Sequence, residues 1–469
     1  MTRSLSFQRI VVAAALVVGA VVVPVATSST PVSAACTWCA GGEYHALTPA
    51  RILDTRPATS INDVAPLGAK PLATTANTFT IDLLGLGGVP SVQGDVLAVA
   101  ASITVVNPTR SGFLGAYAAG SPSVNSVINF AANQNVPNLT ILRPGNNGDV
   151  TITITGSGVG SAHVLVDVFG WWSTSAYDAD TPGNENDERG ARLITPATPG
   201  RILDTRQGTH LWQNSDRAVP IRGADTIGAN PVTDIVPNST NVVGVLINVT
   251  AITPSVSTFM SVVPEDTNGV APATSNLNVQ ALQTKANLVL VPVGADGSIH
   301  VYNANGNAHL LIDVMGYMVT GADEPTRAGR VVPLTSPFRA FDTRRVEFGA
   351  VPLGPGQAED WSFANFAASV NVGGVSVGKQ SALIGNLTNA SLTRQYPSVG
   401  VSPSYLSACP GVCPLNGGIP SYSNVNTVEG AAVPNMALVP YGTNYAVRVF
   451  NARGYAHYIL DVSAVVLAD

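Results

Sequence analysis

Five ionisable side chains recur in the same order three times along this chain of 469 residues. Arg-x-x-Asp-Thr-Arg follows a proline in residues 49–56, 199–206 and 337–344, and Ala-His-x-x-x-Asp-Val occupies 162–168, 308–314 and 456–462. An aspartate in so apolar a segment is costly unless it is paired, and the planar guanidinium of arginine binds a carboxylate bidentately. The pattern therefore predicts an ionic contact between the two ends of each copy. The candidate residues are Arg51, Asp54, Arg56, His163 and Asp167; Arg201, Asp204, Arg206, His309 and Asp313; and Arg339, Asp342, Arg344, His457 and Asp461.

These residues have two interpretations with different functional meaning. In the favoured one they form a polar clasp that joins the ends of a domain, with Arg51 or Arg56 against Asp167 and the same choice in the other copies. The first aspartate then caps the following turn, and the histidine bonds a backbone carbonyl or that aspartate. In the alternative they line a ligand site, which three copies would make multivalent.

Two sets of asparagines also recur between the ends of the copies, and each member of the second set follows its counterpart by nine residues. Capping of turns or of neighbouring strands is favoured for both sets over sugar binding. The sets are Asn129, Asn278 and Asn426, and Asn138, Asn287 and Asn435.

Catalytic signals are weak in this sequence. The segment 374–378 matches Gly-x-Ser-x-Gly around Ser376, but that motif supports a nucleophile only on a strand–turn–helix elbow, whereas the local pattern indicates β-structure. The repeated histidine and aspartate are four residues apart, about 13 Å along a strand, too far for a direct hydrogen-bonded dyad. No zinc-protease motif or phosphate loop is present. We expect no enzymatic activity, no metal and no cofactor, with a serine hydrolase that uses Ser376 as a remote alternative.

The beginning of the chain and the cysteines indicate an exported protein. Residues 1–34 have a positive start, an apolar run at 10–25 and a small-residue cleavage site, which predicts a secretory signal peptide. The cysteines are Cys36, Cys39, Cys409 and Cys413, for which we expect two local disulfides, 36–39 and 409–413. A zinc site that uses both pairs, a redox pair at the first, and a lipidated Cys36 are the alternatives.

Short segments rich in β-branched residues, separated by turn residues, predict β-strands. No segment shows a sustained helical period, and 33 prolines oppose long helices. We expect an all-β protein made of three tandem antiparallel β-sandwich-like domains, with a closed barrel as the alternative. After the signal peptide these domains are residues 35–175, 193–321 and 330–469, joined by linkers 176–192 and 322–329. The acidic stretch 178–188 is interpreted as solvated linker rather than a calcium loop.

The composition excludes several classes of partner. Charged residues make up 11%, the formal net charge is −6 and the chain has only three lysines, whereas nucleic-acid binding requires a basic face. Hydrophobic residues at 45% are sufficient for a folded core. No stretch after the signal peptide is long enough to span a membrane.

Taken together, the opening segment, the Ser-x-x-Asn segment (126–129, 275–278 and 423–426) and the closing segment resemble a repeat of secreted actinobacterial proteins. The resemblance covers residues 46–469. Such repeats occur alone in surface proteins or appended to secreted hydrolases, which implies export, association with the wall or surface, and an accessory role. No activity of the repeat carries over. The third copy departs most from the pattern, since Ala340 and Phe341 replace the Ile-Leu pair of the other two copies.

We therefore expect a non-enzymatic, secreted or cell-surface-associated β-domain array with an adhesive or structural role. The alternative is a multivalent protein that binds cell-wall glycan. Its expected partners are cell-wall polysaccharide or other surface proteins, not nucleic acid.

Overall fold

The computed structural model describes residues 2–3, 41–57, 68–122, 125–174, 177, 190–321, 326–372, 375–390, 404–411, 413, 415–416, 419–427 and 431–469. Most of the predicted signal peptide, with its cleavage site, lies outside the described residues. So do Cys36, Cys39 and the acidic stretch 178–188. The structural account below concerns three stretches: unit one (41–177), unit two (190–321) and unit three (326–469).

Unit one contributes two larger antiparallel sheets. The inner sheet has the order β2 (Tyr44–Asp54), β10 (Gly160–Ser173), β5 (Val96–Val106) and β8 (Val136–Leu142), with β3 (Lys70–Leu72) also paired to β10. The outer sheet has the order β4 (Asn77–Asp82), β9 (Asp149–Gly156), β6 (Gly112–Ala118) and β7 (Ile128–Phe130).

Units two and three have the same strand orders. In unit two the inner sheet contains β11 (Arg192–Ile194), β12 (Gly200–Asp204), β19 (His309–Val319), β14 (Val242–Ile252) and β17 (Thr284–Pro292), and the outer sheet contains β13 (Ser215–Pro220), β18 (Ser298–Asn303), β15 (Thr258–Val263) and β16 (Leu277–Val279). In unit three the inner sheet contains β20 (Val331–Asp342), β31 (Tyr458–Leu467), β24 (Gln380–Ala390) and β29 (Ala432–Pro440), and the outer sheet contains β21 (Gln357–Ser362), β30 (Ala446–Asn451), β25 (Ser404–Cys409) and β28 (Val425–Thr427), with β1 (Thr2–Arg3) beside β21.

The remaining elements are short. Two hairpins pair β22 (Asn371–Val372) with β23 (Val375–Ser376) and β26 (Leu415–Asn416) with β27 (Ile419–Pro420). The helices are α1 (Ala364–Ser369) and the 3₁₀ turns η1 (Thr205–Gln207), η2 (Val346–Phe348) and η3 (Thr443–Tyr445). Among the helices of the described residues, none has the length and apolarity that crossing a membrane requires.

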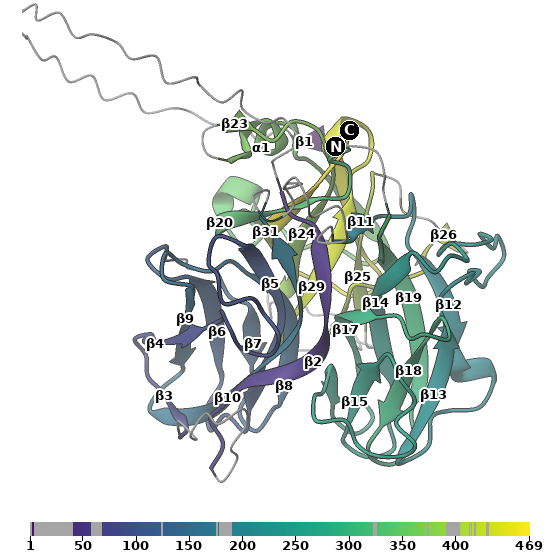
Figure 1. Ribbon diagram of the computed structural model, residues 1–469, viewed down its shortest axis with the longest axis horizontal. Coiled ribbons are helices and arrows are strands. Elements are labelled where there is room, and N and C mark those ends of the chain that lie inside the picture. Colours follow the sequence, from purple (N-terminus) through teal and green to yellow (C-terminus); the bar gives the residue numbers. More distant parts are fainter. Residues whose placement is uncertain are drawn as a thin grey trace, which may run out of the picture.

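The all-β prediction is confirmed, but the expected arrangement of the sheets is wrong. The six larger sheets form a six-blade β-propeller instead of three tandem sandwich-like domains. The barrel alternative also fails, because no sheet in the described part of the chain closes on itself. Figure 1 shows unit one on the left, unit two on the right, and β24 and β29 of unit three between them.

The physical reason for this difference is a core shared by all three units. Apolar side chains of the inner sheets form one buried cluster that includes Leu139 of unit one, Leu246 and Leu288 of unit two, and Leu438 of unit three. The edge strands β8, β17 and β29 contact one another at this centre. The inner sheets are therefore covered on both faces, which explains why β5 is buried along almost its whole length.

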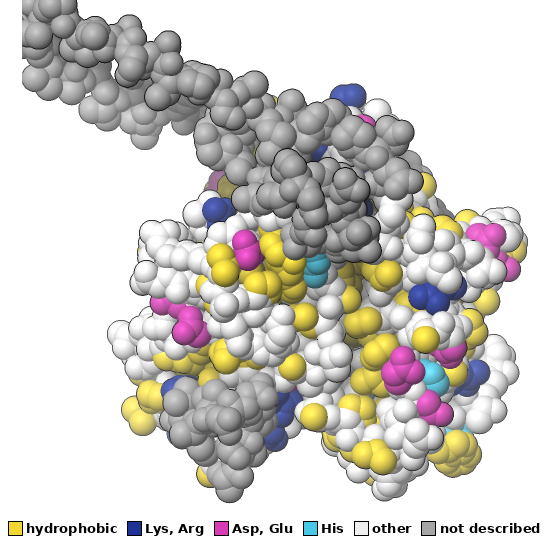
Figure 2. Space-filling view, viewed as in Figure 1, with side chains coloured by type: hydrophobic (Ala, Val, Ile, Leu, Met, Phe, Trp, Pro, Cys, Tyr) yellow, Lys and Arg dark blue, Asp and Glu magenta, His cyan; other side chains and the backbone are white. Residues whose placement is uncertain are grey.

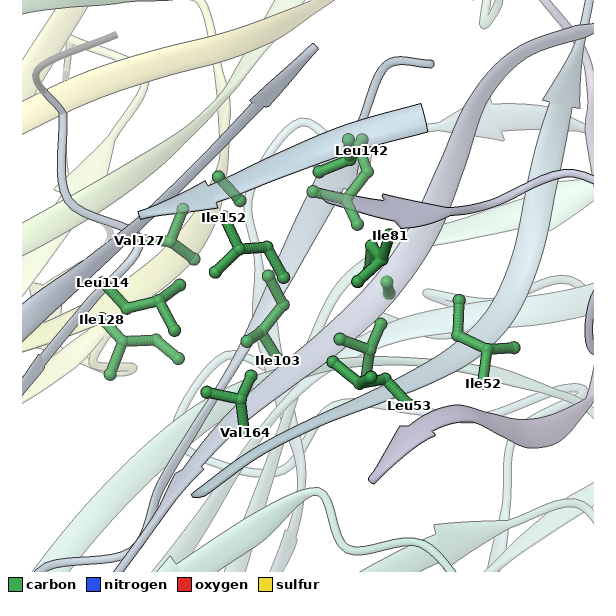
Figure 3. Packing of buried hydrophobic residues seen from close by; sticks show 14 of the residues in the cluster. Ile52, Leu53, Ile81, Ile103, Leu114, Val127, Ile128, Leu142, Ile152 and Val164 are labelled. Atoms are coloured by element: carbon green, nitrogen blue, oxygen red, sulfur yellow. The ribbon is translucent and has the colours of Figure 1, made fainter. Parts of the chain in front are cut away.

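Between the inner and outer sheets each unit buries a further apolar cluster. In unit one, Ile103 of β5 packs with Leu114 of β6 and Ile152 of β9, and all three side chains are buried (Figure 3). The outer strand β9 alternates strictly between partly exposed and buried residues, as expected for a strand with one face toward solvent. On the face drawn in Figure 2, charged side chains are few, and several of the acidic ones gather beside a histidine on the right.

Candidate functional site

The opening and closing strands of each unit lie side by side and are joined by a buried ion pair. In unit one, β2 runs antiparallel to β10 with Arg51 opposite Asp167. The Arg51 guanidinium donates from Nε to Asp167 Oδ1 at 2.7 Å and from Nη2 to Oδ2 at 3.1 Å. The Asp167 side chain is completely buried. Burial raises the pKa of this carboxyl, although the hydrogen bonds from Arg51 act in the opposite direction.

The same contact is present in the other two units. Arg201 binds Asp313 with hydrogen bonds of 2.7 and 3.2 Å, and Arg339 binds Asp461 with hydrogen bonds of 2.8 and 3.0 Å. Thus it is the first arginine of the opening segment that meets the closing strand. A register shift directly beside each pair places that arginine, and the alternation of side chains along a strand does not reveal the shift from sequence.

The second arginine binds the aspartate of its own segment. Asp54 Oδ1 accepts the Arg56 amide at 2.9 Å, and its Oδ2 accepts Arg56 Nη2 at 2.7 Å. Asp204 with Arg206 and Asp342 with Arg344 repeat this arrangement. Burial raises the pKa of Asp54, but the hydrogen bonds from Arg56 outweigh this effect and leave the pKa below its usual value. The second arginines are 37–49% exposed, so solvent weakens these outer pairs.

The histidines contact the threonine of the opening segment and not its aspartate. His163 Nδ1 lies 3.0 Å from the carbonyl oxygen of Thr55, while His309 and His457 lie 3.2 Å from the hydroxyls of Thr205 and Thr343. Burial lowers the pKa of His457.

These threonines were missed as site residues at the sequence level. The Thr55 hydroxyl accepts the backbone amide of Val164 at 2.9 Å, so it links the opening turn to the closing strand. The corresponding hydroxyls of Thr205 and Thr343 accept the amides of Leu310 and Tyr458. Their constant place in Asp-Thr-Arg was the available signal.

The chemistry of the clasp, defined as these three sets of Arg, Asp, Thr and His side chains, is that of strand fastening. Each closing aspartate has both carboxylate oxygens occupied by one guanidinium. A carboxylate held in this way is not available as a general base or nucleophile. Grooves at the junctions between the units are lined by other residues.

The second set of recurring asparagines connects the units. Asn138, Asn287 and Asn435 are buried, and each donates Nδ2 to a backbone carbonyl of its own unit at 2.6–2.7 Å. Two of them also cross between units, since Asn138 donates to Asn386 Oδ1 and Asn435 donates to Asn248 Oδ1, both at 2.9 Å. Their burial leaves no room for a sugar at these amides.

The remaining junction, between units one and two, lacks an asparagine at the position that corresponds to Asn248 and Asn386. Asn248 and Asn386 lie opposite the clasp aspartates of their units, and Ser102 has that register position in unit one. Ser102 is buried, and its hydroxyl has no hydrogen-bond partner among the residues that the structure describes. In the first set, Asn129 on β7 and Asn278 on β16 donate to the hydroxyls of Ser126 and Ser275, each three residues earlier.

An ion cluster that the sequence did not indicate joins all three units. Glu43 precedes β2, Arg192 begins β11 and Arg330 precedes β20. Glu43 Oε1 accepts Arg192 Nη2 at 3.1 Å and Arg330 Nη2 at 2.9 Å, and Glu43 is buried. No motif surrounds these residues. Arg192 falls at the end of the linker expected over 176–192, yet it belongs to a strand.

The other sequence candidates have simpler settings. Cys409 and Cys413 form a disulfide, as the local pairing predicts, so their sulfurs are not metal ligands. Ser376 is exposed on the β22–β23 hairpin, and its hydroxyl accepts the amide of Gly378 at 3.2 Å. A hairpin is not the strand–turn–helix elbow that a nucleophilic serine of this motif requires.

Grooves occur where the units meet. The groove between units two and three has a volume of about 530 Å³, and the one between units one and three about 750 Å³. The groove between units one and two is about 280 Å³ and is named the amide groove here because of its lining. It contains no charged residue and is lined by Asn133, Gln134, Asn135, Ser257, Thr258, Phe259, Asn278, Val279, Gln280, Gln283 and Asn305.

Comparison with known proteins yields little. No family model matches the chain, and no curated protein matches it. Among solved structures, a chain described under the triple jelly roll fold and turret assembly of an archaeal virus is similar at 10% identity over 90% of both chains, with a TM-score of 0.17. The tandem CBM22-1–CBM22-2 domain of Paenibacillus barcinonensis Xyn10C is similar at 11% identity over 58% of this chain and 99% of that one, also with a TM-score of 0.17. Similarity this low does not assign the chain to a family.

Proposed function

We propose that this protein is a non-enzymatic, secreted or cell-surface-associated β-protein with an adhesive or structural role. The observation that supports this proposal is the use of its recurring polar residues. In all three units the closing aspartate is buried and bound on both oxygens by arginine. The chemistry that recurs in this chain therefore holds strands together. A disulfide between Cys409 and Cys413 suits an oxidising compartment.

The resemblance to repeats of secreted actinobacterial proteins supports the same proposal, because such repeats occur in surface proteins. Deletion of the gene in the native host tests it. Loss of cell aggregation, surface adherence or envelope integrity, restored by the wild-type chain and by Ser376→Ala, is the expected result. Restoration by wild type but not by Ser376→Ala would favour the hydrolase instead.

A second candidate function is the binding of cell-wall glycan, and the amide groove favours it. Carboxamides both donate and accept hydrogen bonds, which matches the hydroxyl groups of a sugar. Phe259 in the lining offers an aromatic face on which a sugar ring could stack. The absence of charge from the groove lining favours a neutral saccharide.

A binding assay on insoluble cell wall separates the two candidates. The full chain should be retained by purified wall and released by soluble wall polysaccharide if the groove binds glycan. Gln283→Ala should then reduce retention at least tenfold. The matched control is Gln357→Ala, because the Oε1 atoms of Gln283 and Gln357 both accept the amide three residues earlier, but Gln357 belongs to unit three and does not line the groove. No retention of the wild-type chain would remove the glycan candidate and leave the adhesive or structural role.

A further inference from the structure

Three potential metal ligands meet on the outer sheet of unit two. Asp216 lies on β13, His300 on the neighbouring strand β18, and Asp266 in the loop after β15. One ligand atom from each of these side chains lies within 4.8 Å of the other two. Figure 2 shows a histidine flanked by acidic side chains in this part of the molecule. The residues are 50 and 34 positions apart in sequence, so no motif indicates the cluster.

The two strand residues are already held in place. His300 Nδ1 lies 2.7 Å from Asp216 Oδ2, and both side chains are close to buried, at 10% and 13% exposure. Asp266 is exposed, but its Oδ1 accepts the Asn268 amide at 2.7 Å, which fixes the direction of the carboxylate. The cluster is therefore a hydrogen-bonded pair on neighbouring strands with a third potential ligand on an adjacent loop.

We propose that Asp216, Asp266 and His300 bind a divalent transition-metal ion of the Zn²⁺ type. Zinc binds histidine nitrogen and carboxylate oxygen at about 2.0–2.2 Å in a tetrahedral arrangement, which places two donors on one ion about 3.3–3.6 Å apart. The ligand atoms of the three side chains lie within 4.8 Å of one another, so each separation has to change by at most about 1.5 Å to reach this arrangement. The nitrogen donor favours zinc over calcium or magnesium, which prefer oxygen ligands alone. Two carboxylates balance the charge of the ion, and the exposed side of the cluster leaves the fourth position to water.

The site belongs to unit two alone. At the register positions of Asp216 and His300, unit one has Thr78 and Thr151. Unit three has Ala358 and Arg448 there, and Arg448 instead forms an ion pair with Asp360 at 2.7 Å. Because unit one carries threonine at both positions of the same strand pair, threonine substitutions in unit two are compatible with the fold.

Calorimetric titration of the full chain with Zn²⁺ tests the proposal, together with Co²⁺ as a spectroscopic probe. We expect one Zn²⁺ per chain at this site and a higher unfolding temperature with the ion. His300→Thr and Asp216→Thr should weaken the affinity at least tenfold and change the visible Co²⁺ spectrum. Asp82→Asn, which removes an exposed aspartate on β4 of unit one, should behave as wild type.

Three results would overturn the proposal. They are no Zn²⁺ binding by the wild-type chain, equal affinity in the threonine variants, and tighter binding of Ca²⁺ than of Zn²⁺. If a threonine variant fails to fold, Asp266→Asn on the exposed loop provides the same comparison. These readouts are independent of glycan binding and of adhesion, so the proposal stands or fails separately from the proposed function.

Discussion

Removal of the closing aspartate of unit two measures what the clasp contributes. Asp313 is completely buried, and Arg201 holds it with two charge-assisted hydrogen bonds of 2.7 and 3.2 Å. Breaking a buried ion pair by removing one partner costs about 3–5 kcal/mol, because the other charge remains buried and unpaired. Asp204 Oδ2 lies 3.9 Å from Arg201 Nη1 and compensates part of that charge. We therefore expect Asp313→Ala to lower the free energy of unfolding by about 3 kcal/mol, the lower end of that range.

Urea unfolding at pH 7, followed by circular dichroism and tryptophan fluorescence, provides the assay. The double variant Arg201→Met/Asp313→Leu removes both charges and should recover most of the loss, since apolar residues of similar volume often replace buried ion pairs without cost. Arg206→Ala disturbs only the outer pair, whose arginine is 49% exposed, and should cost less than about 1 kcal/mol. A near-zero effect of Asp313→Ala, or a double variant as unstable as the single one, would refute the reasoning.

Three further predictions concern stability. Lys285 is buried, its Nζ has no hydrogen-bond partner within the described part of the chain, and burial lowers its pKa from 10.5 to about 8. Lys285→Val should therefore stabilise the protein by about 3 kcal/mol at pH 7. In thermal or urea unfolding this gain should shrink as the pH rises from 8 towards 10.5, and a gain independent of pH would contradict the assignment. Ser102→Asn should raise the unfolding temperature by supplying the amide missing from one junction, worth about 1 kcal/mol, whereas a lower unfolding temperature would show that the junction cannot accommodate it. Hydrogen bonds from Arg448 lower the pKa of Asp360 below 3.8, so the contribution of this pair to stability is complete only above about pH 5 and is lost as the pH falls through the lowered pKa. Asp360→Asn should flatten the acid limb of stability measured against pH, and an unchanged limb would argue against the pair.

Lys285 and Ser102 could not be recognised as buried residues from the sequence, as comparison with their counterparts in the other units shows. Val136 and Val433 have the register position of Lys285 in the other units. A lysine that occurs in one copy of three is expected to be exposed, because the neighbouring sequence does not show that both faces of its strand are covered. Ser102 is equally inconspicuous until its neighbours in the adjacent unit are known.

The sequence by itself determined the local chemistry of this protein. Short β-branched segments between turn residues specify strands, and an aspartate in an apolar strand requires a nearby arginine, so the partnership of opening and closing segments could be predicted. The local disulfide of Cys409 and Cys413 could be predicted as well, since the two residues are only four positions apart. These inferences depend on interactions within a strand pair or a few residues of chain.

Only the tertiary structure decided how the units are arranged and which partner each group takes. A register shift selects Arg51 over Arg56 for Asp167, and such shifts leave no trace in the alternation of side chains. Closure into one propeller depends on the faces of the inner sheets that meet in the shared core and on Glu43, whose arginine partners lie 149 and 287 residues away. An apolar residue on a strand has the same appearance whether it faces its own sheet pair or a neighbouring unit. Long-range packing alone distinguishes the two.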